Sequence, residues 1–136
     1  MLAAIRPAGK PPGLWALPKG ALDERGAGER ESPEAAALRE VAEETGAHGR
    51  SLGKLGDVKY VFTWPPRPAE GERIFKVVSF FLIRYEGGRL GDVPEAFRHE
   101  VAEVKWLPLE EAPRLLAYGG EKEMARKALQ RLSEDV

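Results

Sequence analysis

Cysteine and asparagine are both absent from the 136-residue chain, and glutamine occurs once. A chain without cysteine has no disulfide framework, no thiolate zinc site and no cysteine nucleophile. The scarcity of amide side chains, with 13 arginines against 8 lysines, is typical of a thermophilic source, although genome composition gives the same bias. These absences remove several kinds of site without indicating a function.

Long apolar runs and an excess of one charge are missing too. No run approaches the roughly 20 apolar residues of a membrane helix, and Arg6 and Pro7 interrupt the N-terminus before a signal-peptide core. The formal net charge is -1, so no overall basic field points to nucleic acid. We therefore expect a cytoplasmic protein with no membrane and no nucleic acid among its partners.

The composition that remains is that of one globular domain, expected over residues 1–136. Hydrophobic residues make up 43% of the chain and charged residues 32%. Apolar runs between Gly- and Pro-rich turns predict strands at 2–5, 14–18, 55–64, 73–87 and 103–108. Helices are predicted at 33–45, 109–116 and 121–132. Strands mixed with helices favour an α/β sandwich, with Phe75, Phe80 and Phe81 in its core.

The best-defined element is the helix in "ESPEAAALREVAEETG", residues 31–46. Ser32 is a good N-cap, Pro33 suits the first helical position, and Gly46 is the expected end. At about 100° per residue, one face gathers Glu40, Glu43 and Glu44. The opposite face, expected to be buried, holds Leu38, Val41, Ala42 and Thr45.

Two interpretations of this acidic face remain open. It is a solvated surface, or it binds a cation. Solvated faces usually alternate acidic with basic residues, whereas here only Arg39 interrupts. The last turn is also acidic where the helix dipole prefers cations. Clustered carboxylates without His or Cys suit Mg²⁺ or Mn²⁺ better than zinc.

Residues 31–47 resemble the signature of the Nudix hydrolases of the MutT type. Seven residues separate Glu31 from Arg39, and "REVAEETGA" follows with the Arg-Glu-aliphatic-x-Glu-Glu-x-Gly-aliphatic pattern. "WALPKG" before the signature and "EVKWLPLEEA" after it resemble the family's flanking elements. The resemblance implies a Nudix-type α/β/α sandwich with a mixed β-sheet.

Two departures from the family pattern stand out. The opening glycine of the signature should stand at Arg25; its counterpart is Gly20, which implies a five-residue insertion in an exposed loop. Family members also generally begin with another strand before the one matched by "LAAIRP". Either the natural start lies upstream of Met1, or the sheet is completed differently, so this first strand is expected to be missing or replaced.

The resemblance implies a metal-dependent enzyme that hydrolyses the diphosphate bond of a nucleoside diphosphate derivative. The favoured substrates are a dinucleoside polyphosphate or an oxidised nucleoside triphosphate; ADP-ribose and nucleotide sugars remain open. A Nudix domain that senses a nucleotide without cleaving it is the alternative from another class. Family members are often dimers, so a homodimer is an open expectation.

The resemblance also implies roles for single residues. The cofactor, Mg²⁺ or Mn²⁺, would be held by Glu40, Glu43, Glu44 and the carbonyl of Lys19. Arg39 would orient the glutamates and Glu31 would brace the loop, while Gly20 and Gly46 shape the backbone. The general base stays open between Glu40, Glu43 and Glu100, with Glu103 ranked behind Glu100.

Substrate contacts are the least determined part of the prediction. Arg6 and Lys19 are candidates for holding phosphates. Trp15 and Tyr118 are candidates for stacking on a base, but a core position explains Trp15 equally well and a loop anchor explains Tyr118. Lys76 interrupts an apolar strand and points either to phosphates or to solvent.

Overall fold

The computed structural model describes residues 1–19, 31–64 and 71–134. Gly20 and the predicted insertion after it lie outside the described residues. The elements, in chain order, are β1 (Leu2–Pro7), α1 (Pro33–Thr45), β2 (Ala47–Trp64), β3 (Glu72–Gly88), the 3-10 turn η1 (Glu95–Phe97), β4 (Val101–Leu107), α2 (Ala112–Leu115) and α3 (Gly119–Glu134).

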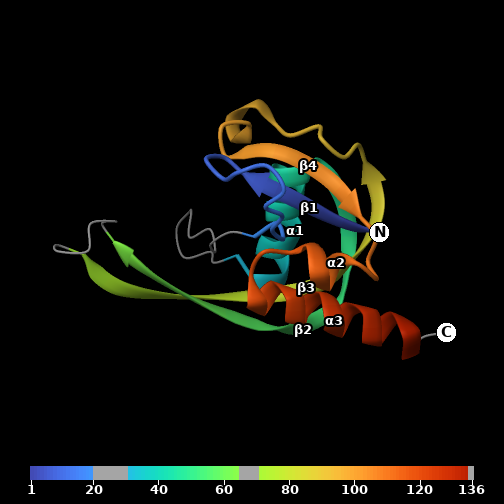
Figure 1. The fold of residues 1–136 in the computed structure, drawn as a ribbon. Coiled ribbons are helices and arrows are strands. Elements are labelled where there is room, and N and C mark those ends of the chain that lie inside the picture. Colours follow the sequence, from blue (N-terminus) through green and yellow to red (C-terminus); the bar gives the residue numbers. More distant parts are fainter. Residues whose placement is uncertain (20–30, 65–70, 135–136) are drawn as a thin grey trace.

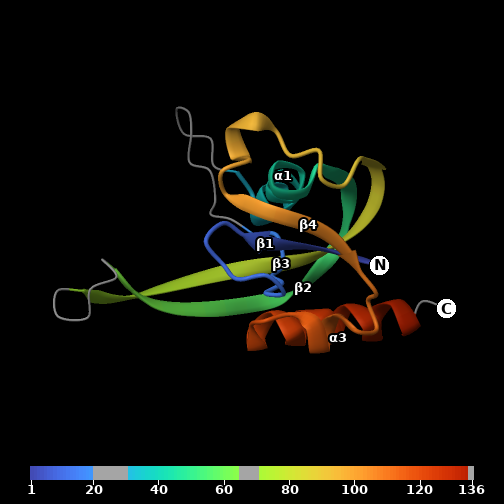
Figure 2. The same ribbon diagram turned by 45° about the horizontal axis from the view of Figure 1, so that its top comes forward.

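Strands lie between two helical layers. β1 pairs antiparallel with β4, and β2 pairs antiparallel with β3 as one long twisted hairpin. α1 and α3 lie on opposite sides of these strands (Figures 1 and 2), and the far end of the hairpin extends beyond both helices. The predicted α/β sandwich is confirmed. Its ladders are antiparallel, and one isolated bridge between Trp15 and Leu116 is parallel.

Helix α1 begins and ends at the predicted residues because its caps are local. The Ser32 Oγ accepts a hydrogen bond from the Ala35 N–H at 3.1 Å, and Pro33 opens the first turn. Gly46 closes the helix with a left-handed φ of 82°. A Cβ at Gly46 would also lie 2.6 Å from the carbonyl oxygen of Asp92, so only glycine fits there.

Three other predicted elements differ in extent. The segment 14–18 is no strand: it makes only single bridges, because Ala16 pairs with Ile5 while Trp15 pairs with Leu116 on the other side. The helix predicted at 109–116 is one turn, Ala112–Leu115. β2 starts at Ala47 rather than 55, since bulges absorb its Gly-rich beginning and keep it paired with β3.

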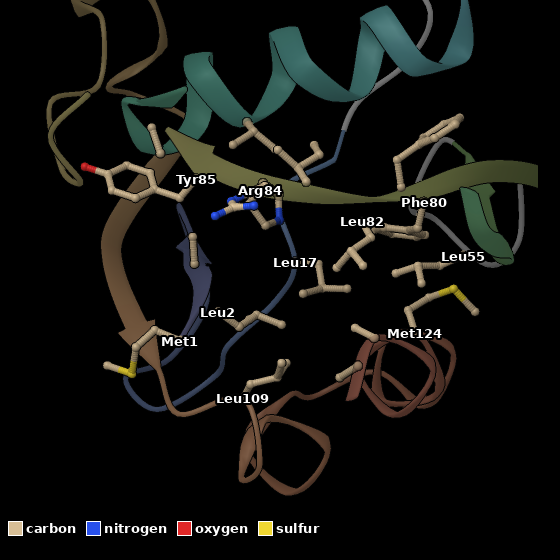
Figure 3. A pocket seen from close by; sticks show the side chains of 18 of the residues that line it. Met1, Leu2, Leu17, Leu55, Phe80, Leu82, Arg84, Tyr85, Leu109 and Met124 are labelled. Atoms are coloured by element: carbon tan, nitrogen blue, oxygen red, sulfur yellow. The ribbon is translucent and has the colours of Figure 1, made fainter. Parts of the chain in front are cut away.

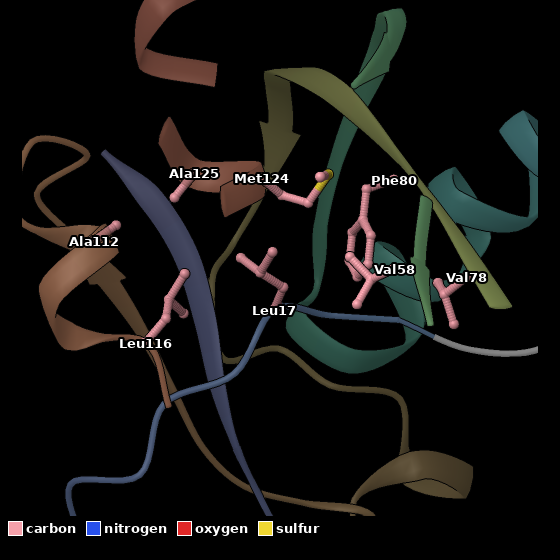
Figure 4. Packing of buried hydrophobic residues seen from close by; sticks show 8 residues of the cluster. All are labelled: Leu17, Val58, Val78, Phe80, Ala112, Leu116, Met124 and Ala125. Atoms are coloured by element: carbon pink, nitrogen blue, oxygen red, sulfur yellow. The ribbon is translucent and has the colours of Figure 1, made fainter. Parts of the chain in front are cut away.

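The hydrophobic core lies between the hairpin and α3 (Figure 4). Its buried members are Leu17, Val58, Val78, Phe80, Ala112, Leu116, Met124 and Ala125. Phe80 is in the core as predicted, but the prediction for Phe75 was wrong: it is 60% exposed, with the Lys59 Nζ 4.3 Å from its ring centroid. None of the described helices combines the length and apolarity that crossing a bilayer requires.

Candidate functional site

Arg39 ties together three of the glutamates around α1. Its guanidinium binds both carboxylate oxygens of Glu31, at 2.7 and 2.9 Å, and its Nη1 lies 2.9 Å from Glu40 and 3.0 Å from Glu43. The bonds to Glu31 are the largest cause that raises the pKa of Arg39. The structure therefore brings four of the five charged signature residues, Arg39 with Glu31, Glu40 and Glu43, into one ion-pair cluster.

Glu44 has a different environment from its neighbours. It is 8% exposed, and its Oε2 accepts a hydrogen bond from the Lys19 backbone N–H at 3.0 Å. Burial raises the pKa of the Glu44 carboxyl to about 8, and the nearby charges of Glu40 and Glu100 act in the same direction.

This burial corrects the expected division of α1 into an apolar buried face and an acidic exposed one. The buried residues of the helix are Ala36, Glu44 and Thr45, whereas Leu38 and Val41 are only half-buried. The reason is that the segment carrying Lys19 covers the end of the acidic stripe. One of the three carboxylates is thus withdrawn from water.

Glu100 lies close enough for its charge to act on both Glu40 and Glu44, whereas Glu103 pairs with Arg6. Burial is the main cause that raises the pKa of Glu40, and the charge of Glu100 contributes to it as it does at Glu44. The Glu100 side chain is 53% exposed in the loop before β4. Glu103 instead accepts a hydrogen bond from the Arg6 Nε at 2.7 Å. Arg6 therefore pairs with Glu103 across the β1–β4 ladder, and its predicted contact with phosphates stays a prediction.

The two aromatic candidates lie in different surroundings. The Trp15 ring has the Lys105 Nζ 5.8 Å from its centroid and packs against the core. The Tyr118 ring centroid lies 5.5 Å from the Lys19 Nζ. The structure therefore supports the core alternative for Trp15 and places Tyr118 beside Lys19.

Two residues of the Lys19 neighbourhood were missed by the sequence reasoning. The Lys19 Nζ lies 3.0 Å from the buried carboxylate of Glu121, and 5.5 Å from the ring centroid of Tyr60. Burial, with a hydrogen bond to Glu121, raises the pKa of Tyr60. An acidic residue in the first turn of a helix is ordinary, so Glu121 carries no signal in the sequence.

Two cavities among the described residues bear on the location of the site. The larger, about 510 Å³, is lined mostly by apolar side chains of β1, β3 and α3, among them Leu2, Leu82 and Met124 (Figure 3). The smaller, about 230 Å³, lies between α1 and β3, and its lining includes Glu40, Lys19 and Lys76. Of these two cavities in the described part of the chain, the smaller is the one lined by a signature glutamate, Glu40, so we assign the candidate site there.

Carboxylate and carbonyl oxygens are the ligands that a hard divalent cation prefers, but in this conformation they do not form a complete coordination site. Within residues 1–19, 31–64 and 71–134, no three His, Asp or Glu side chains converge on one point. Glu40 and Glu43 turn toward Arg39 instead. A cation beside Glu44 would relieve the unfavourable burial of its charge.

Comparison with known proteins assigns the family. A family model described as the NUDIX domain matches residues 1–130. The chain belongs to the Nudix hydrolase family, as the signature predicted.

Similar proteins include the MutT4 protein of Mycobacterium tuberculosis (strain CDC 1551 / Oshkosh). It is 44% identical over 115 residues, which cover 85% of this chain and 41% of that protein. The 8-oxo-(d)GTP phosphatase of Mycolicibacterium smegmatis (strain ATCC 700084 / mc(2)155) is 36% identical over 118 residues, covering 86% and 30%. The chain spans less than half the length of these relatives.

Among solved structures, the crystal structure of a C. elegans Ap4A hydrolase binary complex superimposes with a TM-score of 0.60. The match covers 97% of this chain and 85% of that one, at 23% sequence identity. This likeness confirms the fold and carries no statement about substrate.

Proposed function

We propose that the chain is a divalent-metal-dependent pyrophosphohydrolase that cleaves a phosphoric anhydride bond in a nucleoside diphosphate derivative. The observation that carries the proposal is the buried Glu44 carboxyl, whose pKa is raised to about 8 beside Glu40 and Glu100. A buried carboxylate with two further negative charges nearby favours a bound cation. In this function, residues 1–136 act as one domain.

The roles of the residues follow from their positions. Glu40, Glu43 and Glu44 would hold Mg²⁺ or Mn²⁺, with the Lys19 carbonyl as a further oxygen donor. When bound, such a cation stabilises charge on phosphoryl oxygens and lowers the pKa of a bound water. Arg39, held by two bonds to Glu31, keeps the carboxylates of Glu40 and Glu43 within reach of the site.

The base that accepts a proton from the attacking water comes from the same cluster. Glu40 is half-buried, and its raised pKa brings it closer to the range in which a general base is effective. Glu100 is more exposed and lies on the loop before β4. Glu43 is tied to Arg39 by two bonds, at 3.0 and 3.1 Å. We rank Glu40 and Glu100 ahead of Glu43 as the base.

For the substrate we favour an oxidised guanine nucleoside triphosphate. The support is the 36% identical relative, which is named an 8-oxo-(d)GTP phosphatase. Dinucleoside polyphosphates and ADP-ribose are the competing substrates, and a nucleotide-sensing domain without turnover is the competing function.

The deciding experiment is product analysis on a nucleotide panel with Mg²⁺ and Mn²⁺. The panel holds oxidised dGTP, dGTP, a diadenosine polyphosphate and ADP-ribose, each incubated with wild type, Glu44→Gln and Glu123→Gln. Glu123 is exposed and pairs with Arg126 on α3, so it serves as the matched control. Cation-dependent cleavage that Glu44→Gln loses supports the enzyme. Nucleotide binding without turnover by the wild type supports the sensor.

A further inference from the structure

Glu121 is a fully buried carboxylate to which the mechanism above gives no role. Its side chain is 0% exposed, in the first turn of α3. Its Oε1 accepts from the Leu17 backbone N–H at 2.5 Å, and its Oε2 from the Tyr60 hydroxyl at 2.7 Å. The Lys19 ammonium lies 3.0 Å from the same Oε2. A buried charge persists only when partners satisfy it, and three donors meet here.

Two of these donors belong to the segment that crosses between β1 and α1. Within its described part, residues 15–19 are held by backbone and side-chain bonds at Trp15, Ala16, Leu17 and Lys19. The Trp15 carbonyl accepts from the Ala117 N–H at 2.9 Å, and Ala16 exchanges two backbone bonds with Ile5, at 2.8 and 2.9 Å. Glu121 then binds both the backbone of Leu17 and the side chain of Lys19.

Lys19 in this segment also contacts Glu44 of helix α1. The Lys19 backbone N–H donates to the Glu44 Oε2 at 3.0 Å, while the Lys19 side chain turns to Glu121. The Lys19 Nζ is also 5.5 Å from the ring centroids of both Tyr60 and Tyr118, a geometry that favours a cation. One lysine therefore connects Glu121 on α3 with Glu44 on α1.

We propose that Glu121 is a positioning residue for the cation site: by holding Leu17 and Lys19, it aims the Lys19 N–H at Glu44 and fixes the orientation of that carboxylate. It follows that the Lys19 ammonium binds Glu121 and does not bind substrate phosphates. This inference rests on the proposed function, because it assigns Glu44 to a cation.

The competing explanation is that Glu121 merely anchors α3 to the hairpin through Tyr60. Gly120 shows how closely these elements pack, since a Cβ there would lie 2.4 Å from Val58 Cγ1. An anchor and a positioning residue both affect stability. Only a positioning residue changes the affinity for a cation in a protein that is still folded.

The test measures Mn²⁺ binding to the substrate-free protein by isothermal titration calorimetry, beside the Tm in EDTA. The variants are Glu121→Gln, which keeps the shape but loses the ion pair, Tyr60→Phe, which removes only the hydroxyl bond, and the exposed control Glu123→Gln. We expect Glu121→Gln to weaken Mn²⁺ binding on the order of tenfold. Tyr60→Phe should lower the Tm and leave Mn²⁺ affinity within about twofold of wild type.

Equal Mn²⁺ affinity in wild type and Glu121→Gln overturns the inference while leaving the proposed function intact. A wild type that binds no Mn²⁺ overturns both. Should Glu121→Gln fail to fold, Lys19→Met breaks the same ion pair from its partly exposed end, and the same loss of affinity is expected. A folded Lys19→Met protein with wild-type affinity overturns the inference equally.

Discussion

Glu44 and Glu121 are two buried carboxylates bound by the same residue from opposite ends. Lys19 offers its backbone N–H to Glu44 and its ammonium to Glu121. Glu121 also receives the Leu17 N–H and the Tyr60 hydroxyl. Glu44 has the negative charges of Glu40 and Glu100 nearby, and the pKa of its carboxyl rises to about 8.

The difference lies in where the balancing charge comes from. The chain itself supplies a cation and two further donors to Glu121, which makes that carboxylate a stable part of the architecture. At Glu44, burial is offset mainly by one backbone donor, so a cation from outside has the most to gain there. Burial alone therefore does not separate a structural carboxylate from a binding one; the partners do.

The largest expected effect comes from removing the carboxylate that depends on an external cation. Glu44→Gln should lower kcat by more than roughly a thousandfold, because the site loses a ligand for the ion that stabilises transition-state charge. Steady-state kinetics with saturating Mg²⁺ measure this. The Tm in EDTA at pH 8 should not fall, since the amide needs no balancing charge. Turnover near the wild-type rate would remove Glu44 from the site.

The pH dependence of the free energy of unfolding tests, without substrate, whether Glu44 lacks the balancing charge that Glu121 has. The folded-state pKa of Glu44, about 8, lies above the ordinary carboxyl value of 4.5, so its contribution to stability is present below pH 4.5 and lost as pH rises toward 8. In EDTA, the free energy of unfolding should fall by about 4 kcal/mol between pH 5 and pH 8. Urea denaturation across this range measures it.

Two controls isolate Glu44 in that experiment. Glu44→Gln should remove most of this fall, and the part that remains is the contribution of Glu40, whose pKa burial also raises. Saturating Mg²⁺ should also flatten the curve, by stabilising the charged carboxylate in the folded state. A wild-type curve with no slope in EDTA would mean that Glu44 titrates normally.

The carboxylates of Glu40 and Glu43, unlike that of Glu44, are balanced by a positive charge on the same helix, that of Arg39. Arg39→Lys keeps the positive charge but loses the two-bond grip on Glu31. We expect kcat to fall roughly tenfold to a hundredfold with little change in KM, because the carboxylates lose their orientation rather than their charge. Arg126→Lys, on the exposed face of α3, is the matched control. A rise in KM alone would assign Arg39 to substrate binding.

The smallest expected effect concerns Lys76, which lines the same 230 Å³ cavity as Glu40. Lys76→Met should raise KM for the nucleotide about fivefold, near the 1 kcal/mol typical of a partly exposed charge pair, with kcat unchanged. Lys59→Met is the control, because Lys59 lies over Phe75 on the exposed part of the hairpin. Equal KM values in the two variants would leave Lys76 as a surface residue.

Local features of the fold were predictable from the sequence, and long-range ones were not. Ser32, Pro33 and Gly46 determine α1 through contacts within a few residues, so its bounds were correct. Phe75 looked like core because alternation along a strand does not show where the covering helices end. Its exposure follows from a hairpin longer than the helices that pack on it.

At the candidate site, too, local features were predictable from the sequence and long-range contacts were not. The helical spacing places Glu40, Glu43 and Glu44 on one helix face, and the structure joins Glu40 and Glu43 to Arg39, which in turn holds Glu31. Glu121 is 104 residues from Leu17, and no spacing rule connects two such positions. A bond of this kind becomes visible only when the packing of α3 against the hairpin is known.

The order in which the chain can fold follows from these separations. Helix α1 and the β2–β3 hairpin contain mostly local contacts, so they can form while later residues are still being synthesised. β1 pairs with β4 about a hundred residues later, and the Leu17–Glu121 bond closes a loop of similar size. The acidic helix can therefore exist early in the life of the molecule. Lys19, whose backbone N–H binds Glu44 on this helix, becomes fixed only when Glu121 on α3 packs against it, among the last events of folding.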